Sequence, residues 1–64
     1  MERYRLVDHE SGGDLGPFVS LRLTFVAGET IARRPEERFE VVNVVEAEPH
    51  ENFRAYVVVK RFSE

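Results

Sequence analysis

Two apolar runs near the end of the chain show the clearest strand pattern. β-Branched and aromatic residues fill residues 39–47 and 53–62, and a charged stretch with Pro49 and Asn52 separates them. Such runs around a turn predict two strands of an antiparallel hairpin. Valines occupy both faces of the first run, whereas a strand exposed to water on one side alternates apolar and polar residues. We therefore expect both faces of this hairpin to be covered.

Shorter strands precede the hairpin. Residues 4–7 predict a strand with Tyr4 and Leu6 on one face, and residues 8–16 contain glycines and end at the Gly16-Pro17 pair, which favours a loop. Residues 18–26 alternate most regularly and also predict a strand. Its apolar positions are expected to face inward: Val19, Leu21, Leu23 and Phe25.

The segment before the hairpin leaves alternatives open. Residues 27–30 predict a turn, after which Ile31 either begins a short strand or fills the core. In residues 32–38, Pro35 suits the first turn of a helix, and the two glutamates that follow it would favour the positive end of the helix dipole. The segment is long enough for a single turn only.

These elements predict a single all-β domain over residues 1–64, with four or five antiparallel strands curled into a small half-open barrel. A flatter meander that closes on a second copy is the alternative. The predicted core consists of Tyr4, Leu6, Val19, Leu21, Leu23, Phe25, Ile31, Phe39, Val41, Val45, Phe53, Val57 and Val59.

Two hairpin registers keep the apolar faces together. In the first, charge faces charge and apolar faces apolar, in the pairs Glu46–Arg54, Val44–Tyr56, Val42–Val58 and Glu40–Lys60. In the second, charges meet apolar or aromatic residues, as in Glu46–Tyr56 and Val42–Lys60. Matched pairs contribute about 0.2–1 kcal/mol each, so we expect the first register. Its second face consists of Val42, Val44, Tyr56 and Val58, with a rim of Glu40, Glu46, Arg54 and Lys60.

The short chain limits how the folded domain can be stabilised, and this limit bears on its function. At 64 residues, a folded domain buries only about 60% of the surface that its unfolded chain exposes, and it depends on disulfides, metals or oligomerisation. The chain has no cysteine, which excludes disulfides and thiolate metal sites. We therefore expect a homo-oligomer, a dimer or higher, with another protein as the alternative partner.

The net charge of −3 at pH 7 disfavours electrostatic binding to nucleic acid or to anionic membranes. Residues 1–5 lack the apolar segment of a signal peptide, and no apolar run approaches the roughly 18 residues of a membrane helix. The expected location is the cytoplasm, without a membrane partner.

Polar residues offer little catalytic chemistry. Asp8, His9 and Glu10 form one cluster and His50 with Glu51 another, but both lie in predicted loops, and no spacing places the histidines on one face. The glycine-rich loop lacks the lysine and the helix of a phosphate-binding loop, and no serine lies in a nucleophile motif. We expect no metal, no cofactor, no catalytic residue and no enzymatic activity.

A second function class uses the same hairpin. Arg54, Tyr56, Lys60 and Phe62 interleave cations and aromatic rings along the last strand, as in a small barrel that binds single-stranded nucleic acid. In the expected register, glutamates neutralise Arg54 and Lys60. The two functions compete for Tyr56, because a protein interface buries its ring and a stacking platform exposes it.

The segment Leu21–Ile31 resembles the stretch of SH3 domains that runs from the first long loop into the next strand. Residues 4–8, before a polar loop, fit the same order. The chain has no tryptophan and lacks the aromatic set of an SH3 proline-peptide groove. The resemblance implies an SH3-like topology at most, and fold likeness by itself assigns no ligand.

Together, these observations predict a small soluble interaction or structural module, without enzymatic activity, that self-associates through the second face of its hairpin.

Overall fold

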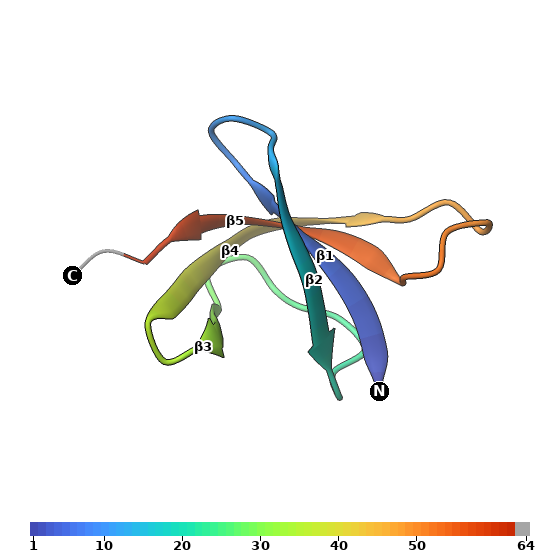
Figure 1. The fold of residues 1–64 in the computed structure, drawn as a ribbon, viewed down its shortest axis with the longest axis horizontal. Helices are drawn as coiled ribbons and strands as arrows, with labels where there is room; N and C mark the ends of the chain where they lie inside the picture. The colour runs from blue at the N-terminus through green and yellow to red at the C-terminus, as the bar shows by residue number, and fades with distance from the viewer. Residues whose placement is uncertain (63–64) are drawn as a thin grey trace.

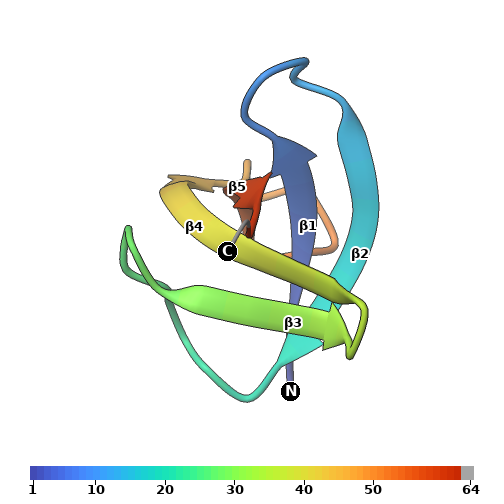
Figure 2. The ribbon, with the colours of Figure 1, turned by 90° about the vertical axis from the view of Figure 1, so that its left-hand side faces the viewer.

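The computed structural model describes residues 1–62 as one five-stranded sheet in the order β2-β1-β5-β4-β3. The strands are β1 (Glu2–Asp8), β2 (Asp14–Ser20), β3 (Thr30–Arg34), β4 (Glu37–Glu46) and β5 (Ala55–Arg61). The sheet twists strongly, so that β3 and β4 run across the direction of β1 and β2 (Figures 1 and 2). The all-β, half-open barrel is confirmed.

One pair of strands departs from the expected antiparallel arrangement. The three pairs β1–β2, β3–β4 and β4–β5 are antiparallel, but β1 and β5 run parallel. The reason is topological: a hairpin and a three-stranded meander join at these two strands. The chain crosses from one edge of the sheet to the other between these two units, and a parallel pair of strands always requires a crossover connection.

The core fills the concave side of the sheet. Most of the predicted core residues are buried there: Tyr4, Leu6, Phe25, Ile31, Phe39, Val41, Val57 and Val59. Ala55 is also buried, although it was not predicted, because it lies beside Tyr4 at the start of β5. The partly buried Leu15, Phe18 and Val44 pack against this cluster.

The prediction of a strand over residues 18–26 is largely wrong. β2 ends at Ser20, and residues 21–29 form a connector to β3. Since β2 and β3 are the two edge strands, the connector runs from one edge of the sheet to the other. A segment that crosses the concave side cannot pair along its length with either edge. Of its alternating apolar residues only Phe25 is buried, while Leu21 and Leu23 are 79% and 63% exposed and Val19, within β2, is half exposed.

Specific contacts hold the connector in place. The Tyr4 hydroxyl donates to the Arg22 carbonyl at 2.5 Å, and Arg54 Nε donates to the Leu23 carbonyl at 2.8 Å. The Arg22 guanidinium also forms a bidentate ion pair with the Glu29 carboxylate. The Phe25 ring packs edge-on against Tyr4, with 5.1 Å between ring centroids. The connector is therefore fixed at several points, with its remaining apolar side chains directed to solvent.

Residues 31–38, for which the sequence left alternatives, form a strand and a tight turn instead of a helical turn. Ile31 is buried within β3, and the chain reverses at Pro35 and Glu36. Proline is favoured at the second position of such turns because its φ is already fixed. The Glu37 carboxylate closes the turn by accepting hydrogen bonds from Arg33 and lying 3.4 Å from Arg34.

Arg33 also bridges the two edges of the sheet. Its Nη1 donates to the carbonyl of Leu15 at 2.7 Å and to that of Pro17 at 3.4 Å, so a side chain of β3 binds the free edge of β2. Gly16 leaves room for this contact, since a Cβ there would lie 3.2 Å from Nη1, and its φ of +100° also favours glycine. The half-barrel is thus closed by a guanidinium instead of a backbone ladder.

We predict that Arg33→Met lowers the free energy of unfolding by about 1–3 kcal/mol, because it removes hydrogen bonds from a charged donor to backbone carbonyls. Arg34→Met is the matched control, since Arg34 is mostly exposed and shares only the Glu37 carboxylate. Urea denaturation of both variants measures the difference. Equal losses would show that Arg33 does not close the sheet.

Candidate functional site

The β4–β5 hairpin begins in the predicted register and then leaves it. Glu40 lies opposite Lys60, and their side chains form an ion pair of 3.8 Å, as expected. Between Val41 and Asn43 the register shifts, which leaves Val42 as an extra residue in a β-bulge. Bulges bend and twist a strand locally, and this bulge lets β4 follow the curvature of the half-barrel.

The bulge exchanges the two faces of β4 beyond it. Val44 lies opposite Val57, points inward and packs against the core, whereas Val45 lies opposite Tyr56 and is 47% exposed. The prediction had these two valines the other way round. A shift of one residue moves every following side chain to the opposite face, so the single inserted residue, Val42, accounts for the wrong assignment of both valines.

The convex side of the hairpin therefore carries a largely apolar surface that we call the outer-face patch, made of Val42, Val45, Tyr56 and Val58, with the exposed Asn43 opposite Val58 between the two valines. Phe53, predicted for the core, is only partly buried and packs edge-on against the Tyr56 ring at 4.9 Å between centroids. β1 continues the patch, since Val7 lies beside Val58 in the parallel register. The contribution of β1 was missed because no local pattern reveals which strand neighbours β5.

The rim of the patch is only partly as predicted. Glu46 lies opposite Ala55, so the expected Glu46–Arg54 pair does not form. Arg54 instead binds the Leu23 carbonyl and the carboxylate of Glu2, the latter at 3.3 Å. The pairing with Glu2 joins residues far apart in the sequence, so no pattern within the hairpin could predict it.

The cations of the nucleic-acid hypothesis are paired with carboxylates but about half exposed, so nucleic-acid binding by these residues stays a prediction. Lys60 is paired with Glu40, and Arg54 is held by the contacts described above. Phe53 packs against one side of the Tyr56 ring. Phe62 is exposed beyond the end of β5, where its N–H donates to the Arg38 carbonyl.

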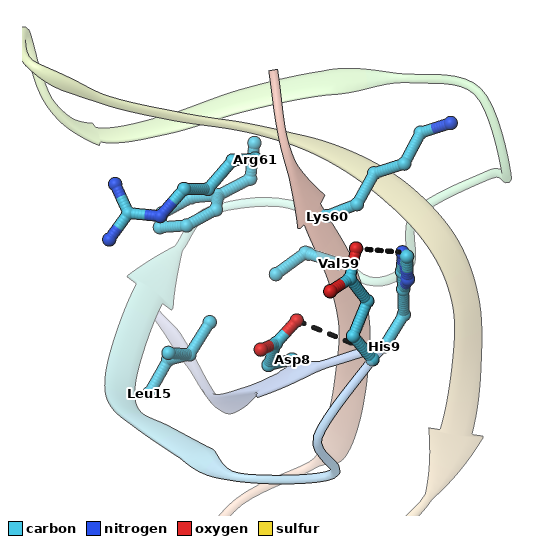
Figure 3. A pocket seen from close by; sticks show the side chains of 8 residues that line it. Asp8, His9, Leu15, Val59, Lys60 and Arg61 are labelled. Carbon is cyan, nitrogen blue, oxygen red and sulfur yellow. Dashed lines mark hydrogen bonds and ion pairs between the residues drawn. The ribbon is translucent and has the colours of Figure 1, made fainter. Parts of the chain in front are cut away.

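A pocket of about 350 Å³ lies at one end of the half-barrel (Figure 3). Its lining combines apolar residues of the core with charged residues of the β1–β2 turn and the end of β5: Asp8, His9, Glu10, Leu15, Phe39, Val59, Lys60 and Arg61. This is where the Asp8–Glu10 cluster of the sequence lies. The second histidine, His50, is on the β4–β5 loop beside Glu51.

The Asp8 carboxylate serves the turn. It accepts hydrogen bonds from the Glu10 N–H at 3.2 Å and the Ser11 hydroxyl at 3.0 Å, and these bonds lower its pKa. His9 lies 3.9 Å from the Glu10 carboxylate and donates its backbone N–H to Val59. Within residues 1–62, no three His, Asp or Glu side chains gather as metal ligands would. The cluster thus orders the turn.

Glu29, in contrast, anchors the connector electrostatically. A hydrogen bond from the Arg22 side chain, and to a smaller extent one from the Val26 N–H, lower the pKa of Glu29 below the ordinary 4.5. A carboxyl whose pKa is depressed on folding stabilises the protein above its ordinary pKa, and this contribution is lost as the pH falls through the depressed value.

We predict that Glu29→Gln makes the protein less stable at pH 7 and less sensitive to acid. The difference in urea midpoint between pH 7 and pH 3 should be smaller than in the wild type, because the variant has no carboxyl to protonate at this position. The same pH dependence in both proteins would contradict the role of the Arg22–Glu29 pair.

The described residues include no helix that is long and apolar enough to cross a bilayer. Comparisons with protein-family models, with curated proteins and with solved structures found no match for this chain. The case for a function therefore rests on the chain's own surfaces.

Proposed function

We propose that this protein is an interaction module without enzymatic activity that self-associates through the outer-face patch. The observation that carries the proposal is the apolar convex side of the hairpin, where Val42 and Val45 are 41% and 47% exposed beside Tyr56 and Val58. Isolated exposed apolar residues are ordinary, but a contiguous group on one sheet face is typical of an interaction surface.

The size of the domain supports the same proposal. The chain exposes 4619 Å², whereas a compact monomeric protein of 7.4 kDa is expected to expose about 4,200 Å². Small domains gain stability when they bury surface in an oligomer, and specific interfaces take about 800 Å² from each partner. The outer-face patch offers apolar area where the sheet has no second layer.

The pairing of charges around the patch favours a protein partner over nucleic acid. The Glu40–Lys60 pair borders the patch, and the Arg5–Asp14 pair at 2.6 Å lies on the neighbouring strands. Mutually neutralised charges at a rim are compatible with a self-complementary interface. They leave little positive potential for phosphates on a chain that is already negative.

The proposal predicts that Val58→Glu breaks the assembly and leaves the domain folded. Val58 lies on the outer side of the central strand, so a carboxylate there would bury an unpaired charge in the apolar contact. Light scattering across a dilution series should give the wild type a mass of at least twice 7.4 kDa, and the variant a lower mass at the same concentration.

Val26→Glu is the matched control, because Val26 is an exposed apolar residue of the connector, away from the patch. It should keep the wild-type mass, and circular dichroism should show that both variants are folded. A wild type that remains monomeric at every concentration, or a Val58→Glu variant of unchanged mass, would refute self-association through this face.

A further inference from the structure

A second pocket, of about 280 Å³, lies over the first half of β1, and we call it the β1 pocket. Tyr4 and Leu6 face the core, so Arg3 and Arg5, which alternate with them along the strand, point to the convex side of the sheet. These two arginines form the floor of the pocket. Its complete floor and walls come from three segments of the chain: Arg3, Arg5, Pro17, Val19, Asn52 and Phe53.

β2 supplies an apolar wall. In the antiparallel register Pro17 lies opposite Arg5, and Val19 lies opposite Arg3. Side chains of directly opposed residues stand on the same face of a sheet, so the two apolar residues lie beside the two arginines. Val19 is 50% exposed in the single chain, which leaves half of its surface open to a ligand.

The end of the β4–β5 loop supplies the other wall, with Asn52 and Phe53. This wall is tied to the floor, because the Arg54 N–H donates to the Arg3 carbonyl at 2.7 Å. The edge-on packing of Phe53 against Tyr56 fixes the position of the Phe53 ring. The β1 pocket therefore exists before any ligand enters it.

The floor carries more positive than negative charge. Arg5 donates to the Asp14 carboxylate through Nε and Nη2, at 3.0 and 2.6 Å, and its Nη1 takes no part in this pair. The ion pairs among residues 1–62 do not include Arg3, and the neighbouring Glu2 is paired with Arg54. Two guanidinium groups thus share one carboxylate. They lie about 7 Å apart along the strand and repel each other, so an anion between them would be stabilised by both.

We propose that the β1 pocket binds a small organic monocarboxylate with an aromatic or branched apolar body. The carboxylate accepts hydrogen bonds from the Arg3 guanidinium and from Nη1 of Arg5, a geometry that suits the planar donors of arginine. The apolar body packs between Val19 and the Phe53 ring. The inference does not depend on the proposed self-association, because the pocket contains no residue of the outer-face patch.

The charge and the size of the pocket select this class of ligand. One positive charge without a partner among the described residues matches a single carboxylate. Ligand pockets begin at about 300 Å³, so the β1 pocket has room for a body of about the size of a phenyl group. The pocket at the end of the half-barrel is less suited to an anion, since the carboxylates of Asp8 and Glu10 are part of its lining.

Titration of the 15N-labelled wild type with N-acetylphenylalanine, followed by NMR, tests the site. Saturable shifts are expected at the amides of Arg3, Val19 and Phe53. The neutral amide of the same compound should bind at least about tenfold more weakly, which corresponds to the loss of one hydrogen bond between charged groups. Equal binding of the two compounds, shifts centred on Leu15 and Val59 of the other pocket, or no saturable shifts would overturn the proposal.

Arg3→Gln tests which cation holds the carboxylate. The Arg3 side chain is exposed, so the variant should remain folded by circular dichroism. It should bind N-acetylphenylalanine about tenfold more weakly than the wild type and bind the neutral amide equally well.

Arg34→Gln is the matched control, because it removes the same charge from an exposed side chain of β3, at the far edge of the sheet. It should keep the wild-type affinity for N-acetylphenylalanine. Unchanged affinity in Arg3→Gln, or an equal loss in both variants, would show that the β1 pocket does not hold the carboxylate.

Discussion

The side-by-side, parallel placement of β1 and β5 is the constraint from which the rest of the structure follows. It puts β2 and β3 at opposite edges of one sheet, so the chain between them must cross the concave side. That crossing delivers Phe25 to the core and presents the Leu23 carbonyl to Arg54. It also leaves the edges without a shared ladder, and Arg33 bridges them with its side chain.

A second consequence concerns the convex side of the sheet. The core lies on the concave side, where the connector covers it, and residues 1–62 include no further element on the other side. The apolar residues that β4 and β5 present outward therefore stay partly exposed in the single chain. In a domain this small, burial of such a surface against another copy adds stability that the chain cannot obtain from its own core. The proposed self-association would therefore be coupled to folding.

The sequence pattern predicted the features that depend on residues close to one another in the chain. The strand at Tyr4 and Leu6, the β4–β5 hairpin and the Glu40–Lys60 pair all depend on neighbours in sequence or on one turn. The connector was mistaken for a strand because its apolar alternation is real, although only Phe25 finds a place in the core. Its conformation depends on which strands are neighbours, and this is a non-local property.

The candidate site was predicted in outline and misassigned in detail. Two valines precede Asn43 and two follow it, so each face of the strand receives valines in either register. The pattern therefore allows either Val44 or Val45 to face outward. The bulge at Val42 decides between them, and bulges have no signature in a run of valines. The partner of Arg54 was equally beyond reach, because Glu2 comes to it through the β1–β5 pairing.

The accessibility of Tyr56 tests the central claim most directly. The chain has no tryptophan and only two tyrosines, and Tyr4 is buried, so iodide quenching of tyrosine fluorescence reports on Tyr56. If the outer-face patch is the contact between copies, quenching should decrease as the protein concentration rises into the range of assembly. Quenching that stays constant while the mass rises would show that the copies associate through another surface and would contradict the account.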